Sequence, residues 1–344
     1  MNGKTRVVQY GVGPIGASIA QLMRQKCAIE ICGAIDSDPA KVGRDLGDVV
    51  GAGDAPWGIP ISDDEPRVLQ QAPHVVIHST SSSLPRVMDQ LLACVRAGSC
   101  VVSTCEELAY PFRTNPALAE KLDAEAKAHG VAVVGTGVNP GFVMDKLAVT
   151  LAAESQRVEQ VRISRVVNAS NRRLPLQRKI GAGMTPDDFA ASAANGTIRH
   201  VGLPESVAMI AHYLNLPVEE ISEMIEPVIA RERVSSDFLT VETGQVAGVH
   251  QIARGLSGGR DLVYLELQMY VGAKNPYDRI ELQGHPAVSL MIPSGSHGDI
   301  ATASVVVNSV PAILQAQPGL RTSCDLPIGF LSPTLETLPR WRTR

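Results

Sequence analysis

Short apolar runs alternate with longer amphipathic segments along the first 147 residues. The apolar runs have the length of buried strands, and they are TRVVQY, IEICGAI, HVVIHS, CVVSTC and VAVVG. Helical periodicity predicts helices in IGASIAQLM and over 84–97 and 115–130, and Gly98 is the stop signal of the second one. Strands that alternate with helices indicate a parallel sheet with right-handed crossovers, so residues 1–147 are predicted to form one α/β domain.

From about residue 148 polar and apolar positions alternate with the period of a strand. This pattern covers VEQVRISRVVN and the long segment from SSDFLTVE to ELQMYVG, in which Ser257-Gly258-Gly259 predicts a hairpin turn. A helical region is predicted over 204–232, from PESVAMIAHYLNL to PVEEISEMIEPVIARE. Successive strands without helices between them are typical of an antiparallel sheet. We therefore expect residues 148–298 to form an α+β domain for substrate binding and oligomerisation.

Residues 299–344 begin with an apolar segment rich in small residues, which predicts a helix over 300–314. Small side chains allow close packing, so we expect this helix and the tail to return to the first domain. The glycine-rich turn before the helix, IPSGSHGD, contains His297. Two interpretations of His297 stay open: a substrate contact beside the cofactor, or a helix-start cap or other satisfied polar group.

The turn after the first strand reads GVGPIG, where Gly11, Gly13 and Gly16 satisfy the fingerprint GxGxxG. The first glycine of this motif permits a tight turn, the second lets a pyrophosphate approach the backbone, and the third lets helix and strand pack closely. Pro14 and Ile15 begin the helix, whose free N–H groups and dipole favour an anion. The predicted fold class is an α/β Rossmann dinucleotide-binding domain plus an α+β second domain with a mainly antiparallel sheet.

The second strand ends in Asp36, about twenty residues beyond Gly16, where the dinucleotide fold places an acid on the adenosine ribose. An acid there repels a 2′-phosphate, so Asp36 with Ser37 favours NAD. Lys41 and Arg44 follow closely and could soften this preference, so NADP stays open. An alternative function of Asp36 is to cap the turn DSDPAK.

Three further strands end in polar or glycine-rich sequence, and parallel strands present these ends at one edge of the sheet. We expect them to line one crevice, with NPG opening a helix whose N–H groups hold the nicotinamide carboxamide. The predicted cofactor contacts at these ends are Ser79, Thr80, Cys105, Asn139, Pro140 and Gly141.

Two adjacent acids, Glu106 and Glu107, follow the strand CVVSTC. Because ligands bind beyond the carboxyl ends of parallel strands, at least one of them is predicted to reach the reacting carbon as a catalytic acid or base. The alternative is that both are solvated loop charges or an acid pair at a helix start.

A polar, basic stretch begins at the end of the first strand of the second domain. Arg173 is a candidate for binding a substrate carboxylate, since arginine offers two parallel donors, although a solvated basic face is the alternative. Asn168 and Ser170 end that strand and are predicted to contact a polar substrate. Aromatic residues make up only 4% of the chain, so an apolar substrate pocket would be mainly aliphatic, with Phe142 and Tyr110 as exceptions.

Composition excludes several classes of protein. A formal net charge of −4, without a Lys/Arg run longer than two, lacks the footprint of a nucleic-acid binder. No apolar run reaches the roughly 18 residues that span a membrane. The six cysteines form no CxxC pair, so no metal site is predicted and a reducing compartment is the simplest setting. Lys4 and Arg6 stand where a signal peptide would be apolar, so we expect a cytoplasmic protein.

Several longer motifs make the chain similar to a known family. The segments VVQYGVGPIG, STCEELAYPF, GTGVNPGFVMD, RRLPLQRKIGAGMT, HVGLPESVAMIA and IPSGSHGDIATA together resemble the 2,4-diaminopentanoate dehydrogenases and related native amine dehydrogenases. These belong to the wider group of dihydrodipicolinate-reductase-like dinucleotide enzymes. The resemblance extends from about residue 5 to about residue 327.

The resemblance implies an NAD(P)-dependent enzyme that interconverts an amine with a ketone or aldehyde plus ammonia, with 2,4-diaminopentanoate and 2-amino-4-oxopentanoate as the expected pair. It also implies a homodimer built through the sheet of the second domain. In this family a glutamate after the fifth strand handles the amine, and the matching positions are Glu106 and Glu107. We favour Glu106, because it ends the strand where homoserine dehydrogenases have a catalytic lysine.

Two other functions are compatible with the scaffold. One is an imine or carbonyl reductase of the dihydrodipicolinate reductase or homoserine dehydrogenase type. The chain lacks the HHxxKxDAPSGT pattern of the former and has glutamate in place of the lysine of the latter. The other is a dinucleotide-binding protein that has lost catalysis.

Overall fold

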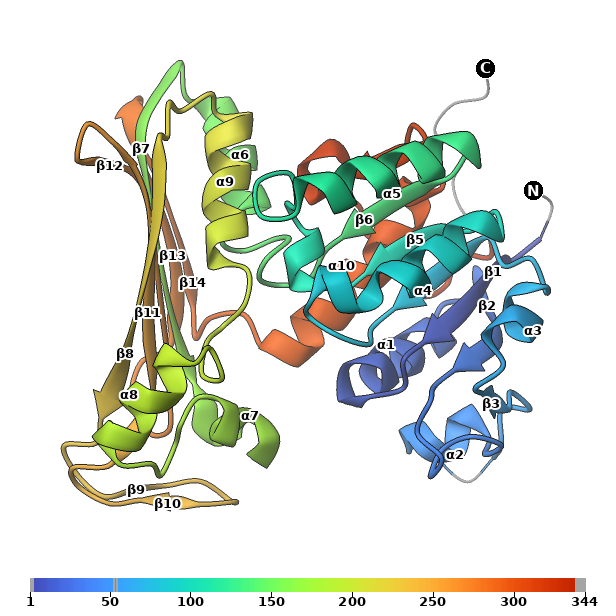
Figure 1. Ribbon diagram of the computed structural model, residues 1–344, viewed down its shortest axis with the longest axis horizontal. Coiled ribbons are helices and arrows are strands. Elements are labelled where there is room, and N and C mark those ends of the chain that lie inside the picture. Colours follow the sequence, from blue (N-terminus) through green and yellow to red (C-terminus); the bar gives the residue numbers. More distant parts are fainter. Residues whose placement is uncertain (1–2, 52, 54, 338–344) are drawn as a thin grey trace. The chain divides into compact units, whose positions relative to one another are not determined.

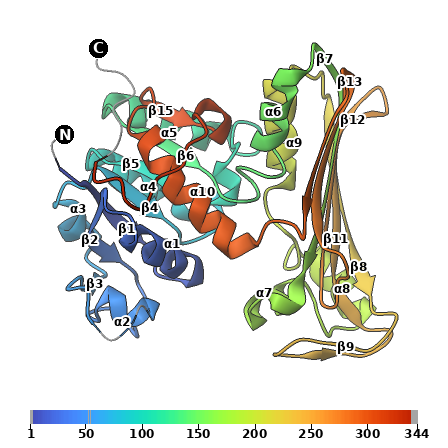
Figure 2. The same ribbon diagram turned by 180° about the vertical axis from the view of Figure 1, so that it is seen from behind.

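The computed structural model describes residues 3–51, 53 and 55–337. The chain forms two compact units: unit 1 extends to Phe142 and resumes at His297, and unit 2 is Val143–Ser296 (Figures 1 and 2). The boundaries expected from the sequence, after residues 147 and 298, lie five and two residues further along the chain. Unit 2 is therefore inserted into unit 1.

Unit 1 is built on a parallel sheet, which within the described residues has seven strands in the order β15-β6-β5-β4-β1-β2-β3. The strands are β1 (Thr5–Tyr10), β2 (Ile29–Ile35), β3 (Ile61–Ser62), β4 (Val75–His78), β5 (Cys100–Ser103), β6 (Ala132–Gly135) and β15 (Gly319–Arg321). The helices are α1 (Pro14–Arg24), α2 (Leu46–Val50), α3 (Glu65–Leu69), α4 (Leu84–Arg96), α5 (Pro116–Ala128) and α10 (Gly298–Ile313), with the 3-10 turns η1 (Glu106–Leu108) and η4 (Ser323–Asp325). The predicted α/β Rossmann fold is confirmed.

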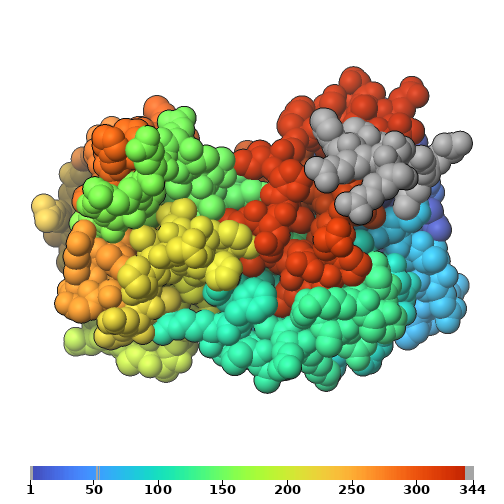
Figure 3. Space-filling view, turned by 90° about the horizontal axis from the view of Figure 1, so that it is seen from above, coloured from blue at the N-terminus to red at the C-terminus, as the bar shows by residue number. Residues whose placement is uncertain are grey.

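Helices cover both faces of this sheet because successive strand residues point to opposite sides. Val7 and Val102 pack with α1 and α10 on one face, whereas Val8 and Val101 pack with α4 and α5 on the other. Strand β15 pairs with β6 and contacts α5, so residues near the C-terminus complete the sheet begun at the N-terminus. Figure 3 shows this C-terminal segment, in red, beside the green surface of α5.

Unit 2 contains a mixed sheet with the strand order β14-β13-β7-β12-β11-β8, in which only β7 and β12 pair in parallel among the described strands. The strands are β7 (Arg157–Asn168), β8 (Glu220–Ile229), β11 (Val246–Ser257), β12 (Arg260–Tyr270), β13 (Tyr277–His285) and β14 (Val288–Pro293), beside the small ribbon β9 (Val234–Ser235) and β10 (Thr240–Val241). The helices are α6 (Lys146–Leu151), α7 (Leu174–Lys179), α8 (Pro186–Ala194) and α9 (Leu203–Tyr213), with the 3-10 turns η2 (Ala152–Glu154) and η3 (Ala169–Asn171). The mainly antiparallel second sheet and the hairpin turn between β11 and β12 are confirmed.

The predicted helical region over 204–232 is wrong in its second half. Helix α9 ends at Tyr213, and β8 follows at Glu220–Ile229. The segment EISEMIEPVI contains good helix formers, but it pairs with β11 from Leu256↔Glu220 to Val246↔Ile229. Pairing with a distant strand thus overrides local helix propensity.

All six cysteines are free thiols. Among the described residues, no group of three or more His, Cys, Asp or Glu side chains could hold a metal ion. No helix in the described ranges combines the length and apolar character that crossing a membrane requires.

Candidate active site

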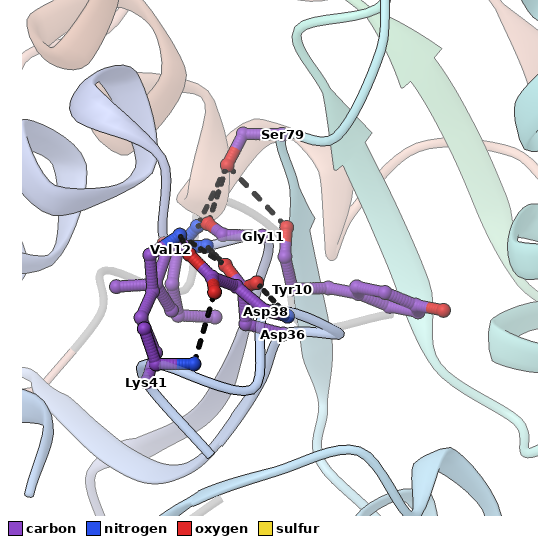
Figure 4. A network of polar contacts seen from close by, with 9 residues as sticks. Tyr10, Gly11, Val12, Asp36, Asp38, Lys41 and Ser79 are labelled. Carbon is purple, nitrogen blue, oxygen red and sulfur yellow. Dashed lines mark hydrogen bonds and ion pairs between the residues drawn. The ribbon is translucent and has the colours of Figure 1, made fainter. Parts of the chain in front are cut away.

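The turn after β1 carries the glycine fingerprint (Figure 4). Gly11 has a φ of +88°, and a Cβ added there would collide with the carbonyl oxygen of Ser79. A Cβ on Gly16 would collide with the carbonyl oxygen of Gly11, so this glycine lets α1 approach the turn. A Cβ on Gly13, in contrast, meets no described atom within 4 Å. The protein's own packing requires glycine at positions 11 and 16, whereas the space beside Gly13 is open to a ligand.

Helix α1 begins at this open position. Gly13 is the N-cap residue in an extended conformation, and Pro14 is the first helical residue. Proline suits this position because a backbone N–H in the first turn would have no partner inside the helix, so nothing is lost when proline lacks it. The side chain of Ile15 packs against the core, so the backbone of the first turn is what the helix offers to an anion.

Asp36, directly after β2, binds the glycine turn. Its Oδ2 accepts from the backbone N–H of Val12 at 2.7 Å and from Lys41 Nζ at 3.2 Å, and its Oδ1 accepts from the N–H of Asp38 at 2.9 Å (Figure 4). Burial alone would raise the pKa of Asp36, but these hydrogen bonds lower it. The carboxylate is therefore ionised at neutral pH, and it caps its own turn as well as facing the fingerprint. Ser37 is exposed.

Ser79 and Thr80 follow β4, and their hydroxyls bind other protein groups. Ser79 Oγ donates to the carbonyl of Gly11 and accepts from Gln9 Nε2, both at 2.9 Å. Gln9 Nε2 also donates to the Gly11 carbonyl, so the side chains of Gln9 and Ser79 both hold the glycine turn in place. Thr80 Oγ1 donates to Gln90 Oε1 at 2.8 Å. Gln9 is not among the residues predicted from the sequence, although a glutamine inside the apolar run TRVVQY is a signal for it.

The two glutamates after β5 have different surroundings. Glu107 Oε2 accepts from the backbone N–H of Leu84, the first residue of α4, at 2.8 Å. The N–H of Glu107 donates to the carbonyl of Ser82, so this residue ties η1 to the start of α4. Glu106 is half-buried and is the first residue of η1. The predicted acid pair is thus divided: Glu107 caps a helix, and Glu106 begins η1. The expectation that Glu106 ends the strand is wrong, because β5 ends three residues earlier, at Ser103.

Cys105, predicted as a cofactor contact, has its side chain in the core of unit 1. Its thiol donates to the carbonyl of Ser82 at 3.2 Å, and burial raises its pKa to about 12. A contact to a cofactor at this position would therefore involve the backbone.

The segment Asn139-Pro140-Gly141 follows β6 and contains a cis peptide before the proline. The expectation that it opens a helix is wrong: residues 141–145 form turns, and α6 begins at Lys146. Asn139 is 8% exposed, and neither atom of its side-chain amide has a hydrogen-bond partner among the described residues. Buried polar groups are rarely left unpaired, so this amide is suited to a polar ligand group.

Besides Arg173, the predicted substrate contacts are Asn168, Ser170, His297 and Phe142. Asn168 Oδ1 accepts from the N–H of Ser170, and Ser170 Oγ accepts from the N–H of Gly272, both at 2.9 Å. His297 is exposed and is the N-cap of α10, where its Nδ1 lies 3.5 Å from the N–H of Ile300. Phe142 is half-buried at the end of the first segment of unit 1.

Unit 2 contains a buried arginine that is absent from the residues predicted from the sequence. Arg165 is 3% exposed, its Nη2 donates to the carbonyl of Ser296 at 2.6 Å, and its Nε lies 3.5 Å from Asp278 Oδ1. Its Nη1 is buried without a hydrogen-bond partner among the described residues. The alternation of β7 is the signal that reveals it, because Arg165 continues the buried row of Val161 and Ile163.

More positive charge surrounds this arginine. Burial lowers the pKa of His200 to about 3, and the charges of Lys179 and Arg165 add to the shift, as does that of Arg172. His200 is therefore neutral, and its Nδ1 is buried without a partner in the described part of the chain. We call Arg165, Arg172 and Lys179, together with the neutral imidazole of His200, the cationic cluster. Arg173, the N-cap of α7, adjoins it in sequence, and its buried Nε also has no described partner.

Comparisons with known proteins give a consistent result. A family model described as the 2,4-diaminopentanoate dehydrogenase C-terminal domain matches residues 142–332. The 2,4-diaminopentanoate dehydrogenase of Acetoanaerobium sticklandii is 28% identical over 333 residues, which cover 94% of each chain. An amine dehydrogenase of Streptomyces virginiae is 23% identical, covering 93% of this chain and 96% of its own.

A solved structure agrees with these sequences. The amine dehydrogenase from Mycobacterium smegmatis superposes with a TM-score of 0.85 at 26% identity, and the match covers 97% of this chain and 99% of that one. The family model alone accounts for more than half of the chain. The chain therefore belongs to the 2,4-diaminopentanoate dehydrogenase family, whose members are oxidoreductases that act on amines.

Proposed function

We propose that the protein catalyses the reversible oxidative deamination of an amine with a nicotinamide dinucleotide, and that Glu106 is its catalytic residue. The observation that carries the assignment is the division of the acid pair. Glu107 Oε2 accepts from the N–H of Leu84 at the N-terminus of α4, whereas Glu106 begins η1 three residues beyond β5, at the edge of a parallel sheet where ligands bind.

The described residues fit a dinucleotide. The open space at Gly13 and the start of α1 suit a pyrophosphate, and the ionised carboxylate of Asp36 suits a ribose. The side-chain amide of Asn139, which no described residue hydrogen-bonds, has a donor side and an acceptor side that complement a nicotinamide carboxamide. When bound, this cofactor supplies the hydride for amination and accepts it in deamination.

Glu106 performs the proton transfers of this reaction. In the aminating direction its carboxylate takes a proton from ammonium, and the resulting ammonia forms a C–N bond with the carbonyl carbon while the C=O π bond opens to an alkoxide. One N–H proton of this adduct moves to the alkoxide oxygen, which gives the neutral carbinolamine. The protonated glutamic acid then returns the proton to the hydroxyl of the carbinolamine, which leaves as water. The carboxylate that remains stabilises the cationic iminium until it is reduced.

We further propose 2-amino-4-oxopentanoate, the ketone that corresponds to 2,4-diaminopentanoate, as the physiological substrate class. Within unit 2, Arg165 Nη1 is a buried donor that has no hydrogen-bond partner among the described residues, and a carboxylate complements it. A guanidinium binds a carboxylate through parallel hydrogen bonds, and each charge-assisted bond contributes about 1.5–3 kcal/mol. The names of the relatives support the same class of substrate.

Replacing Arg165 by lysine is expected to raise KM for 2-amino-4-oxopentanoate at least about tenfold, because lysine keeps the charge beside Asp278 but lacks the second nitrogen of the fork. KM for an uncharged ketone such as 2-pentanone should change little. Arg254→Lys is the matched control, since Arg254 binds Asp261 through two 2.7 Å contacts at an exposed position of β11. A uniform rise in KM for both ketones would refute the carboxylate assignment.

The proposed activity is tested by initial rates of NADH and NADPH oxidation with these two ketones, with and without ammonium. We expect oxidation to require ammonium. We also expect kcat/KM to favour NADH by at least about tenfold, because Asp36 is ionised and Lys41 is already paired with it. Rates that do not depend on ammonium would indicate a carbonyl reductase instead. The cytoplasmic location and the homodimer stay predictions, which fractionation and the native mass in solution will decide.

A further inference from the structure

A polar network lies inside unit 1 beneath the carboxyl ends of β4 and β5. His78 is the last residue of β4, Ser103 is the last residue of β5, and the two face each other in the parallel register. Both are 0% exposed among otherwise apolar strand residues. Buried polar groups lower the stability of a core unless they are hydrogen-bonded, whereas a fully paired network makes the surrounding backbone rigid. The partners of His78 and Ser103 therefore decide what the two residues do.

The directions of these hydrogen bonds follow from the groups involved. Gln90 Oε1 can only accept, so the ring nitrogen of His78 that faces it at 2.9 Å, Nε2, carries the proton. Thr80 Oγ1 lies 3.0 Å from the same nitrogen and is its second acceptor, because the Thr80 hydroxyl donates to Gln90 Oε1. Nδ1 is then an acceptor, and Ser103 Oγ donates to it at 2.9 Å. The same oxygen accepts from the backbone N–H of Cys105 at 3.1 Å. Burial lowers the pKa of His78 to about 4, which keeps the ring neutral and this direction fixed at neutral pH.

The network ends at the peptide between Thr104 and Cys105, one residue before Glu106. Ser103 fixes the N–H of Cys105, and the backbone N–H of Thr104 donates to the carbonyl of His78 at 2.9 Å. On the other side, Thr80 Oγ1 donates to Gln90 Oε1. The segment after β5 is therefore held to β4 by side-chain as well as main-chain bonds, immediately before η1 begins.

We propose that Ser103 and His78 are positioning residues that fix the backbone orientation of Glu106. The inference rests on the proposed function of Glu106, because neither Ser103 nor His78 is given a contact to substrate or cofactor. A carboxylate that transfers protons has to be held within a fraction of an ångström, and a misplacement of about 1 Å can cost about 100-fold in rate. The network acts on kcat through Glu106 and leaves cofactor binding at the glycine turn unchanged.

Ser103→Ala is the first test, with Ser99→Ala as its matched control. Ser99 is also 0% exposed, and it donates a buried hydrogen bond to the carbonyl of Pro73 at 2.8 Å. It immediately precedes the first residue of β5, whereas Ser103 is the last. Both variants lose one buried hydroxyl, so both should lower the melting temperature. Only Ser103→Ala should lower kcat, by at least about fivefold, with KM for NADH within about twofold of the parent enzyme. Equal kcat in the two variants overturns the proposal.

Two substitutions of His78 separate the two sides of the ring. The side-chain oxygen of His78→Asn reaches the place of Nδ1 and accepts from Ser103, whereas His78→Gln reaches the place of Nε2 and leaves the Ser103 hydroxyl without its acceptor. We expect His78→Asn to keep most of the turnover that His78→Gln loses. A better activity of His78→Gln contradicts the proposed direction of the network.

Hydrogen exchange of the segment 100–110 gives a measurement that does not depend on activity. The amide of Cys105 should exchange faster in Ser103→Ala than in Ser99→Ala, since its acceptor is removed. Faster exchange without a change in kcat shows that the segment is held by Ser103 but that catalysis does not need it, which overturns the proposal. Absence of any ammonium-dependent turnover in the unmodified enzyme is a separate result, because it refutes the proposed function.

Discussion

Glu106→Gln is expected to lower turnover at least about 100-fold, whereas Glu107→Gln stays within about threefold of the parent enzyme. Glutamine has nearly the shape of glutamate but cannot take a proton from ammonium, so the loss at position 106 measures acid–base function. At position 107 the amide oxygen of glutamine still accepts from the N–H of Leu84, so the cap of α4 survives in weakened form. Steady-state rates with ketone, ammonium and NADH at saturation measure the difference.

The adjacent positions make this pair its own control. Both variants lose one negative charge in the same turn, so a general electrostatic effect would appear in both. Affinity for NADH should remain within about twofold in each, because neither residue is assigned to the cofactor. Loss of turnover in Glu107→Gln with an active Glu106→Gln reverses the assignment, and activity in both removes carboxylate catalysis from this turn.

Gly13→Ala is expected to weaken NADH binding at least about tenfold while the melting temperature stays within about 2 °C of the parent protein. The protein has room for a methyl group here, since an added Cβ meets no described atom within 4 Å. A pyrophosphate close to the backbone would lose that room. Fluorescence titration with NADH and a thermal melt of the free protein measure the two quantities.

Substitutions of Gly3 and Gly16 are the controls for Gly13→Ala. Gly3→Ala changes another open position before β1 and should alter neither quantity. Gly16→Ala forces a Cβ against the carbonyl oxygen of Gly11 and should lower the melting temperature as well as the affinity. Unchanged affinity in Gly13→Ala would mean that the pyrophosphate does not approach this residue.

Local patterns predicted the parts of this protein that depend on neighbouring residues. Short segments of sequence are enough to predict the glycine fingerprint, the first strands and the position of Asp36 at the end of the second strand. The structure has each of them at the predicted place. The function of Glu107 could not be predicted in this way, because its partner Leu84 lies 23 residues earlier in the chain. The sequence likewise predicts a helix where β8 lies, because the pairing of this segment with the distant strand β11 cannot be recognised from neighbouring residues.

The candidate site shows the same limit. The sequence predicts that the NPG segment acts through the N–H groups of a helix. In the structure residues 141–145 form turns, and the Asn139 side-chain amide has no hydrogen-bond partner among the described residues. Arg165 could have been found from the alternation of β7, which places it in a buried row. The pattern does not show which nitrogens of Arg165 are paired. Its Nη2 and Nε lie against Ser296 and Asp278, which follow it by more than a hundred residues, and Nη1 is left without a described partner.

The insertion of unit 2 into unit 1 has a consequence for synthesis of the chain. The first 142 residues contain the fingerprint, Asp36 and Glu106, but not α10, which packs with α1 against one face of the sheet, nor β15, which pairs with β6. The ribosome makes all of unit 2 before these two elements emerge. During that interval Val306, Val307 and Val310 are not yet available to cover the nucleotide-binding sheet. Unit 2 is thus the first of the two units whose residues are all present, although unit 1 is begun first.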